Sequence, residues 1–391
     1  MSESAAITVI TNTRVFDGQA LLHGTKTVVI ENSMIKSIDN YKGNDDIVKG
    51  RYQGTSVTIV DGSGCTLLPG LIDTHVHIQT VEQLSSCAVH GVTTVCDMAC
   101  AGEAYKKLRA ISKAGENPTS WLATSLPAYA ADSRHGQMFR FLGIGDENAL
   151  STADEVAPFV EARVADEVDY VKIIADEPGL SQDVLDAIQS ESRKRGLKTV
   201  AHTAQHVAFQ RGLDAGFDVL THAPMDEALD LAMAQRMVAQ GTVAIPTLAM
   251  MEAFKKSWVL WPMYYKRDFS KAVQSVTVMR KAGVMILAGS DANAAPVVSN
   301  RHGGSLLREL ELLVAAGLTP TETLSAATAL PAAYFRLNDR GRVAAGLRAD
   351  LLLVEGDPTV DISTVRKRRH VWSAGKPVEN VQDQSWNCVL M

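Results

Sequence analysis

The sequence predicts an α/β protein built on a (β/α)8 TIM barrel, with a small outer β-sandwich domain formed by both ends of the chain. Between about residues 66 and 335, eight short apolar runs alternate with segments of helix length. Apolar runs without internal polar alternation are typical of parallel strands buried on both faces. Eight such units over roughly 270 residues match the usual size of this barrel. The runs are TLLPGLIDTHVHI, TTVCDMA, SWLATS, DYVKIIAD, LKTVAHT, FDVLTHA, TVAIPT and VMILAGSD.

Both ends of the chain have a different pattern, in which strand-like runs are separated by Gly, Asn and Asp. Residues 7–61 contain ITVITNTRVFD, KTVVIEN, MIKSIDN and VTIVDG, and the stretch from Gly341 contains GRVAAGLRADLLLVEGDP and HVWSAGKPV. Short runs with such turn residues between them indicate hairpins. We therefore predict an outer β-domain from residues 1–65 and 341–391, the latter including a tail, and a barrel over residues 66–340.

The composition is that of an ordinary globular chain of 391 residues, 46% hydrophobic and 21% charged, with a formal net charge of -6. Phosphate binding needs clustered Lys and Arg. The net negative charge of this chain therefore disfavours nucleic acid as a partner. The sequence shows no secretory signal pattern and no apolar run approaching the roughly 18 residues of a membrane span. We expect a cytoplasmic protein that acts on a small molecule. The outer domain and the exposed barrel helices favour a homo-oligomer.

The cysteines do not predict a disulfide framework, because the five are an odd number without CxxC pairs. The chain ends CVLM, and Cys388 followed by two aliphatic residues and Met fits a prenylation box. The preceding residues carry no polybasic signal to supplement one lipid chain, and four residues match such a pattern easily by chance. Prenylation of Cys388 therefore stays open.

Residues 69–78 read PGLIDTHVHI, an apolar strand that ends with two histidines. Successive side chains of a strand point to opposite faces, so His75 and His77 point to the same side. In a barrel of this kind, active sites form at the C-terminal ends of the strands. Four other runs also carry ionisable residues near that end. They are Lys172, His202, His222 and Asp291.

These six groups would crowd one mouth of the barrel. Each alone has an ordinary explanation, since a barrel histidine is often only hydrogen-bonded and a strand-end Asp often caps the next helix. Together, their imidazoles and carboxylate are suitable ligands for a zinc-like ion. Lys172 is the exception, because an ammonium group repels a metal. A carbamate formed with carbon dioxide would convert it into an anionic ligand with two oxygens.

The chain resembles the amidohydrolase superfamily, in its imidazolonepropionase-like and prolidase-like branch of metal-dependent hydrolases. The resemblance spans essentially the whole chain and rests on a combination of motifs, of which HxH alone would be weak. The motifs are PGLIDTHVHI, GVTTVCDM, VKI, AHT, THA, GSD and HGGSLLRELELLVAAGLTPTETLSAAT, with GRVAAGLRADLLLVEGDP in the outer domain.

The resemblance implies a dinuclear centre of two divalent metal ions, expected to be zinc, with manganese or another ion as an alternative. Asp291 would bind the more buried ion with the two histidines of PGLIDTHVHI, and His202 and His222 would bind the more exposed one. Lys172, carboxylated at Nζ, would bridge them. A hydroxide shared by the ions would attack the substrate carbonyl, and Asp291 would carry its proton to the leaving group. The implied ligands are His75, His77, Lys172, His202, His222 and Asp291.

Substrate contacts are expected on the loops after the strands. The family commonly has a Gly-His-Gly turn after strand 3, and here SRHGQ aligns His135 but places Arg134 at the first glycine. Arg134 and Arg301 are candidates for binding a substrate carboxylate. His302 either contacts the substrate or orients the loop after strand 8. Ala204 stands where the family commonly has tyrosine, which departs from its dipeptide recognition.

The segment after strand 7, AMMEAFKKSWVLWPMYYKRDF, is rich in aromatic residues. Its rings either pack a helical insertion against the barrel or form a lid over a bulky substrate. The rings are Trp258, Trp261, Tyr264 and Tyr265.

The leading hypothesis is a metal-dependent amidohydrolase that cleaves the C–N or C–O bond of an amide, lactam or ester. The bond would be a non-peptide or dipeptide-like one, for example in an N-acyl amino acid or a bulky natural product. A non-hydrolytic member of the same superfamily, an isomerase, decarboxylase or hydratase, would use the same metal centre. A catalytically silent scaffold is a third interpretation, which the complete ligand set disfavours.

Overall fold

The structure is a computed structural model that describes most of the chain. The aromatic residues Trp258, Trp261, Tyr264 and Tyr265, and Cys388 with its CVLM box, lie outside the described residues. Within the described part, every helix is too short or too polar to cross a membrane. The described ranges are 6–43, 57–100, 102–117, 119–141, 143–146, 148–257, 267–295, 298 and 300–379.

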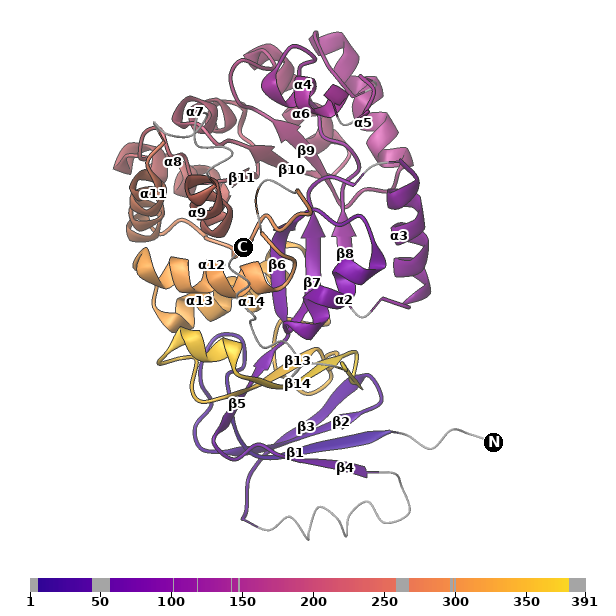
Figure 1. Cartoon of the computed structure of the whole chain (residues 1–391), viewed down its shortest axis with the longest axis vertical. Coiled ribbons are helices and arrows are strands. Elements are labelled where there is room, and N and C mark those ends of the chain that lie inside the picture. The colour runs from indigo at the N-terminus through magenta and orange to yellow at the C-terminus, as the bar shows by residue number, and fades with distance from the viewer. Residues whose placement is uncertain are drawn as a thin grey trace.

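Two parallel sheets form the centre of the α/β part (Figure 1). One has the strand order β6-β7-β8, and the other has the order β12-β11-β10-β9. Most residues of these strands are buried, which confirms the prediction of apolar strands covered on both faces. The strands are β6 (Leu71–Val76), β7 (Val92–Asp97), β8 (Ser120–Ala123), β9 (Tyr170–Ile174), β10 (Lys198–His202), β11 (Val219–Thr221) and β12 (Val243–Ile245).

Helices alternate with these strands along the chain and lie around the sheets (Figure 1). This alternation confirms the predicted α/β class. Two further helical turns are 3-10 in form, η1 (Ala153–Glu155) and η2 (Ile362–Arg366). The α-helices are α2 (Val81–Val89), α3 (Gly102–Ala114), α4 (Arg134–Phe141), α5 (Val156–Ala165), α6 (Gln182–Lys194), α7 (His206–Ala215), α8 (Leu231–Gln240), α9 (Leu248–Lys256), α11 (Phe269–Ala282), α12 (Gly304–Ala315), α13 (Pro320–Ala326) and α14 (Ala329–Tyr334).

The eighth predicted strand, VMILAGSD, makes isolated backbone contacts instead of a continuous ladder. Ile286 pairs with Ala244 of β12, and Ala292 pairs with Val76 of β6. Asp291 interrupts the pairing with β6, because its φ of 57° lies in the left-handed region and cannot continue a strand. The segment therefore contacts both β12 and β6, but with a locally irregular backbone.

Strands from both ends of the chain pair in one outer sheet, which lies beside the α/β part (Figure 1). Its order is β15-β14-β13-β5-β1-β2-β3, with β4 paired to β1. The two ends meet where β5 and β13 pair antiparallel. The strands are β1 (Ile7–Val15), β2 (Lys26–Glu31), β3 (Met34–Asn40), β4 (Val57–Asp61), β5 (Cys65–Pro69), β13 (Leu351–Glu355), β14 (Arg368–Ser373) and β15 (Lys376–Pro377).

The chain crosses from the outer sheet to the α/β part at Gly70. This residue separates β5 from β6, so the change of sheet comes later than the boundary predicted at residue 65. A Cβ atom at Gly70 would lie 2.2 Å from Thr93 Oγ1, so no larger residue fits without a shift of that side chain. The Gly70 N–H donates to the Asp350 carbonyl at 2.8 Å, which ties the crossing to the start of β13.

Strand β13 separates two hydrophobic cores. Leu351 and Leu353 belong to the core of the outer sheet, whereas Leu352 and Val354 belong to the main core of the α/β part. This division follows from the alternation of side chains along a strand. One strand thus fastens the outer sheet to the rest of the molecule.

Replacing Leu352 with Ala should lower the free energy of unfolding by about 2–5 kcal/mol, because it removes a fully buried side chain from the main core. Urea unfolding followed by circular dichroism measures this change. Val360→Ala is the control: its side chain is 77% exposed, so its effect should stay within about 0.5 kcal/mol. Equal small effects of both variants would contradict the assignment of Leu352 to the main core.

Candidate active site

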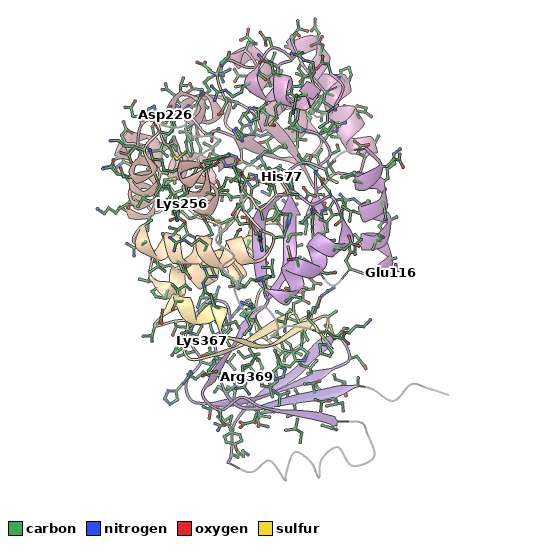
Figure 2. All side chains as sticks on the ribbon, viewed as in Figure 1. His77, Glu116, Asp226, Lys256, Lys367 and Arg369 are labelled. Atoms are coloured by element: carbon green, nitrogen blue, oxygen red, sulfur yellow. The ribbon has the colours of Figure 1, made fainter. Side chains whose placement is uncertain are left out.

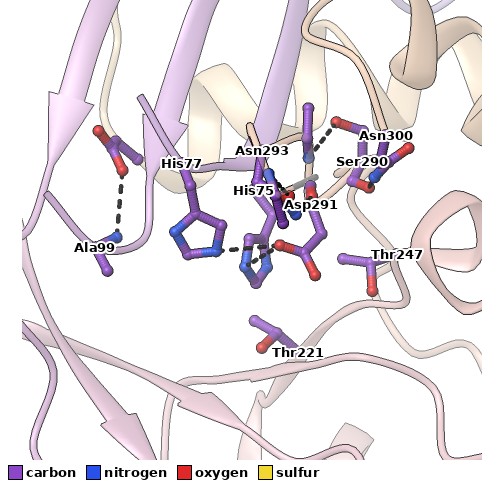
Figure 3. A network of polar contacts seen from close by, with 12 residues as sticks. His75, His77, Ala99, Thr221, Thr247, Ser290, Asp291, Asn293 and Asn300 are labelled. Carbon is purple, nitrogen blue, oxygen red and sulfur yellow. Dashed lines mark hydrogen bonds and ion pairs between the residues drawn. The ribbon is translucent and has the colours of Figure 1, made fainter. Parts of the chain in front are cut away.

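Two histidines at the end of β6 lie beside the carboxylate of Asp291 (Figure 3). Nε2 of His75 and Nε2 of His77 lie 3.5 Å and 3.1 Å from Asp291 Oδ1. The residue between them, Val76, points the other way and is packed in the main core. The alternation of the strand thus brings two imidazoles to one carboxylate.

His222, which follows β11, completes this first group. Its Nδ1 lies 2.8 Å from Thr247 Oγ1 and 3.8 Å from Asp291 Oδ2. The potential ligand atoms of His75, His222 and Asp291 all lie within 4.8 Å of one another, and all three residues are buried. We call these three residues the inner triad.

Three residues of this region have left-handed backbone conformations, with φ values of 74° at His222, 49° at Thr247 and 57° at Asp291. Such conformations cost L residues about 1–2 kcal/mol each and occur mainly where the surroundings enforce them. Here the Asp291 N–H donates to the His75 carbonyl at 2.7 Å, and the His222 N–H donates to the Ile245 carbonyl at 2.9 Å. Neighbouring strands therefore hold the unusual backbone that turns these side chains toward each other.

A second group, the outer triad, consists of His135, Asp176 and His202, which are half-buried. Asp176 follows β9, and its Oδ2 accepts a hydrogen bond from His202 Nε2 at 3.2 Å. The ring centroids of His135 and His202 are 4.6 Å apart. Burial acts to raise the pKa of Asp176, but the adjacent His202 and a bond from the Ala204 N–H hold it below its ordinary value. The outer triad therefore contains a charged carboxylate.

Lys172 of β9 interacts electrostatically with one carboxylate of each triad. Its Nζ is buried and donates to Thr221 Oγ1 at 3.1 Å. Burial lowers the pKa of Lys172 to about 7, although the carboxylates of Asp291 and Asp176 act to raise it. A substantial fraction of this amine is therefore neutral near pH 7. The rings of His202 and His222, 4.2 Å apart between centroids, place the triads side by side.

The lowered pKa values of three histidines in the site favour neutral imidazoles, which suit the binding of divalent cations. Burial holds the pKa of His75 and His222 well below the ordinary value and lowers that of His135 to about 3. A neutral imidazole has a ring nitrogen with a free lone pair, which a metal can bind. For His77, burial acts to lower the pKa, but its hydrogen bond to Asp291 gives a net increase. His75 Nδ1 is also buried without a hydrogen-bond partner among the described residues.

Asp73 forms hydrogen bonds with His75 of the inner triad and with Ser290, which precedes Asp291. The sequence analysis did not identify it. Its carboxylate accepts from Ser290 Oγ at 2.5 Å, from the Ser290 N–H at 2.9 Å and from the His75 N–H at 3.2 Å. Burial raises the pKa of Asp73 to about 7 despite these bonds. A carboxylate inside the apolar run of PGLIDTHVHI was the signal that could have revealed it.

Asp97, at the end of β7, was also missed. It accepts from Trp121 Nε1 at 3.0 Å and from the Ile78 and Ala99 N–H groups, both at 3.2 Å. Burial raises the pKa of Asp97 to about 6. Asp97, Asp176 and Thr247 are each the last polar residue of a strand run or follow it directly, so the strand-end rule applied consistently would have identified all three.

The four predicted substrate contacts lie in different surroundings. His135 belongs to the outer triad, and Arg134 beside it is exposed at the start of α4. His302 is buried, and its Nε2 donates to the His77 carbonyl at 2.9 Å, so it supports the backbone of the histidine pair. Arg301 is exposed. Their contacts with a substrate stay predictions. Figure 2 shows His77 well inside the α/β part, whereas Glu116 and Asp226 lie at its periphery.

Glu309 of α12 supports the residue that contacts His222. Thr247 precedes α9, but its hydroxyl lies against His222 and makes no capping bond to the helix. Glu309 Oε2 accepts from the Ala249 N–H, in the first turn of α9, at 2.6 Å. Burial raises the pKa of Glu309 to about 8. A carboxylate from another helix thus takes the capping role that Thr247 leaves open.

Replacing Glu309 with Gln should change how stability depends on pH. Because folding raises the pKa of Glu309 from 4.5 to about 8, its contribution to stability decreases as the pH rises through that window. The free energy of unfolding of Glu309→Gln, relative to wild type, should therefore increase by at least about 1 kcal/mol between about pH 5 and pH 8. Urea unfolding at both pH values measures this. A difference that does not vary with pH would contradict the assignment.

The chain belongs to the Amidohydrolase family, whose family model matches residues 66–378. It is 25% identical over 390 residues to an adenine deaminase of Lysinibacillus sphaericus (strain C3-41), covering 95% of this chain and 57% of that protein. The chain thus spans little more than half the length of that relative.

Two further similarities cover nearly the full length of both proteins. The chain is 25% identical over 394 residues to an imidazolonepropionase of Ectopseudomonas mendocina (strain ymp), covering 87% of this chain and 89% of that protein. It resembles the crystal structure of a Xaa-Pro dipeptidase with bound methionine in the active site, with a TM-score of 0.81, 21% identity, and coverage of 95% and 99%. These matches confirm the predicted resemblance to the superfamily and to its imidazolonepropionase-like and prolidase-like members.

Proposed function

We propose that the protein is a metal-dependent hydrolase that cleaves an amide, lactam or ester bond at a dinuclear centre. The observation that carries this proposal is the pair of adjoining triads, most of whose members follow parallel strands, together with the buried Lys172. Membership of the Amidohydrolase family supports hydrolysis of C–N bonds. As substrate we propose an N-acyl amino acid or a bulky natural product.

The proposal includes a closed (β/α)8 barrel and an outer β-sandwich built from both ends of the chain, with the first boundary moved from residue 65 to the crossing at Gly70. Parallel bridges support closure, because they link the two sheets on both sides. Ala128 pairs with Ile173 of β9, while the eighth segment pairs with both β12 and β6. A cytoplasmic location and a homo-oligomeric state stay predictions.

Two divalent ions, zinc or else manganese, would supply Lewis acidity that polarises the substrate carbonyl and lowers the pKa of water. The histidine pair of β6 and Asp291 would hold the buried ion, and His202 and His222 the exposed one. Asp291 would accept the proton of the attacking water and deliver it to the leaving amine or alkoxide. Asp73 and His302 would keep the histidine pair oriented through its backbone.

Lys172 is proposed to be carboxylated at Nζ. The neutral amine attacks carbon dioxide, a new N–C bond forms, and one proton is released to give a carbamate anion. The depressed pKa of Lys172, about 7, supports this step because only the neutral amine is nucleophilic. The carbamate would replace a buried cation with an anion that offers two oxygen ligands between the triads.

Replacing Asp291 with Asn should leave most of the metal bound but lower kcat by at least about 100-fold, because an amide cannot carry the proton. Elemental analysis and steady-state kinetics on the same preparation measure both quantities. Asp226→Asn, an exposed carboxylate that pairs with Arg267, is the control and should retain full activity. A near-wild-type rate in Asp291→Asn would reject the proton-carrier role, and an active metal-free enzyme would reject the function itself.

Hydrolysis is separated from non-hydrolytic chemistry by the mass of the product. The metal-loaded protein should be screened against acyl amino acids, dipeptides, lactones and aryl amides. We expect the products together to exceed the substrate by the mass of one water. An unchanged mass would indicate isomerisation, and loss of carbon dioxide would indicate decarboxylation; either result would replace the proposed hydrolysis.

A further inference from the structure

The outer triad contains a side-chain carboxylate, which the predicted ligand set for the exposed ion lacks. That set pairs His202 with His222 and has no side-chain carboxylate apart from the carbamate of Lys172. In the structure, the potential ligand atoms of His222 gather with those of the inner triad. His202 gathers with Asp176 and His135, and its ring also lies 4.2 Å from the ring of His222 between centroids.

We propose that Asp176 and His135, together with His202, bind the more exposed cation. This inference rests on the proposed function, because it assigns further ligands to the second ion of the same centre. It changes His135 from a predicted substrate contact into a metal ligand. It also gives a role to Asp176, which no motif of the sequence identified.

The position of Asp176 is fixed by two neighbouring strands. The Ala175 N–H donates to the His202 carbonyl at 3.0 Å, which continues the pairing of β9 and β10 past the strand ends. The Ala204 N–H then donates to Asp176 Oδ1 at 2.9 Å. One carboxylate oxygen is therefore held by the backbone, while Oδ2 faces the His202 ring at 3.2 Å. The carboxylate is in place before any ligand binds.

His135 is positioned by the tight start of α4. The Gly136 N–H donates to Ser133 Oγ at 3.0 Å, which anchors the first turn of the helix. A Cβ atom at Gly136 would lie 2.5 Å from the carbonyl oxygens of Ala130 and Ala131, so the helix start lies directly on the preceding loop. This contact holds His135 edge-on to His202.

The charges of the centre favour the same assignment. The inner triad has the carboxylate of Asp291, and the outer triad has that of Asp176. Lys172 interacts electrostatically with both carboxylates. Each cation would then have its own carboxylate, and the exposed ion would not depend on the carbamate of Lys172 for negative charge. Imidazole and carboxylate together are typical ligands of zinc.

Replacing Asp176 with Asn distinguishes a metal ligand from a residue that only orients His202. The Asn oxygen can still accept the hydrogen bond of His202 Nε2, but it supplies no charge to a cation. We expect Asp176→Asn to bind the second zinc ion at least tenfold more weakly than wild type, with the first ion unaffected. His135→Gln should show the same loss, and Asp176→Glu should recover part of it. Competition titration of metal-free protein with a zinc-binding indicator measures both affinities.

Asp226→Asn is the matched control, because Asp226 follows β11 and also accepts bonds from backbone N–H groups, those of His206 and Glu227. It should bind two ions as wild type does, and thermal unfolding should show that all variants are folded. Two ions bound with wild-type affinity by both Asp176→Asn and His135→Gln would overturn this inference and leave the proposed function intact. Wild-type protein that binds neither zinc nor manganese would overturn the proposed function.

Discussion

The candidate site depends on the buried hydrogen bonds between Asp73 and Ser290. Asp73 lies two residues before His75, and Ser290 directly precedes Asp291, so these bonds set the distance between histidine and carboxylate. The eighth segment makes no continuous ladder with β6, and the Asp73 carboxylate supplies the register that a ladder would otherwise provide. Asn300 adds to this by donating from Nδ2 to the Ser290 carbonyl at 2.6 Å. These contacts act together with the bond from the Asp291 N–H to the His75 carbonyl in holding the left-handed backbone at Asp291.

A second buried carboxyl group, that of Glu309, also supports the inner triad indirectly. Thr247 leaves the start of α9 uncapped so that its hydroxyl can contact His222, and Glu309 satisfies the helix from α12. Asp73 and Glu309 are both buried, and burial raises the pKa of each well above that of an ordinary carboxyl group. Burial of such groups is unfavourable unless hydrogen bonds compensate for it. Asp73 accepts from the residue that precedes Asp291, and Glu309 accepts from the first turn of α9, the helix that follows Thr247 and its contact with His222.

The sequence predicted the parallel strands and the convergence of His75 with His77, because period-two alternation is a local property of one strand. It also placed the C-terminal ends of several strands at one mouth. It did not predict the partners that His202 has in the outer triad. The contact of His202 with Asp176 depends on the register between β9 and β10, and that of His135 depends on the course of the loop before α4. Such partnerships arise from three-dimensional packing, as does the burial that shifts the pKa of Lys172.

The exposure of the site residues defines the side from which a substrate can approach. The side chain of His75 is 1% exposed and that of Asp291 10%, whereas His202 and Asp176 are 18% and 17% exposed and His77 is 30% exposed. His77 and the outer triad therefore line the accessible side of the site, and the carboxylate of Asp291 lies deeper. Arg134 is exposed next to His135 of the outer triad. The two carboxylates thus differ in exposure as well as in partners, because that of Asp291 contacts the histidine pair and that of Asp176 contacts His202.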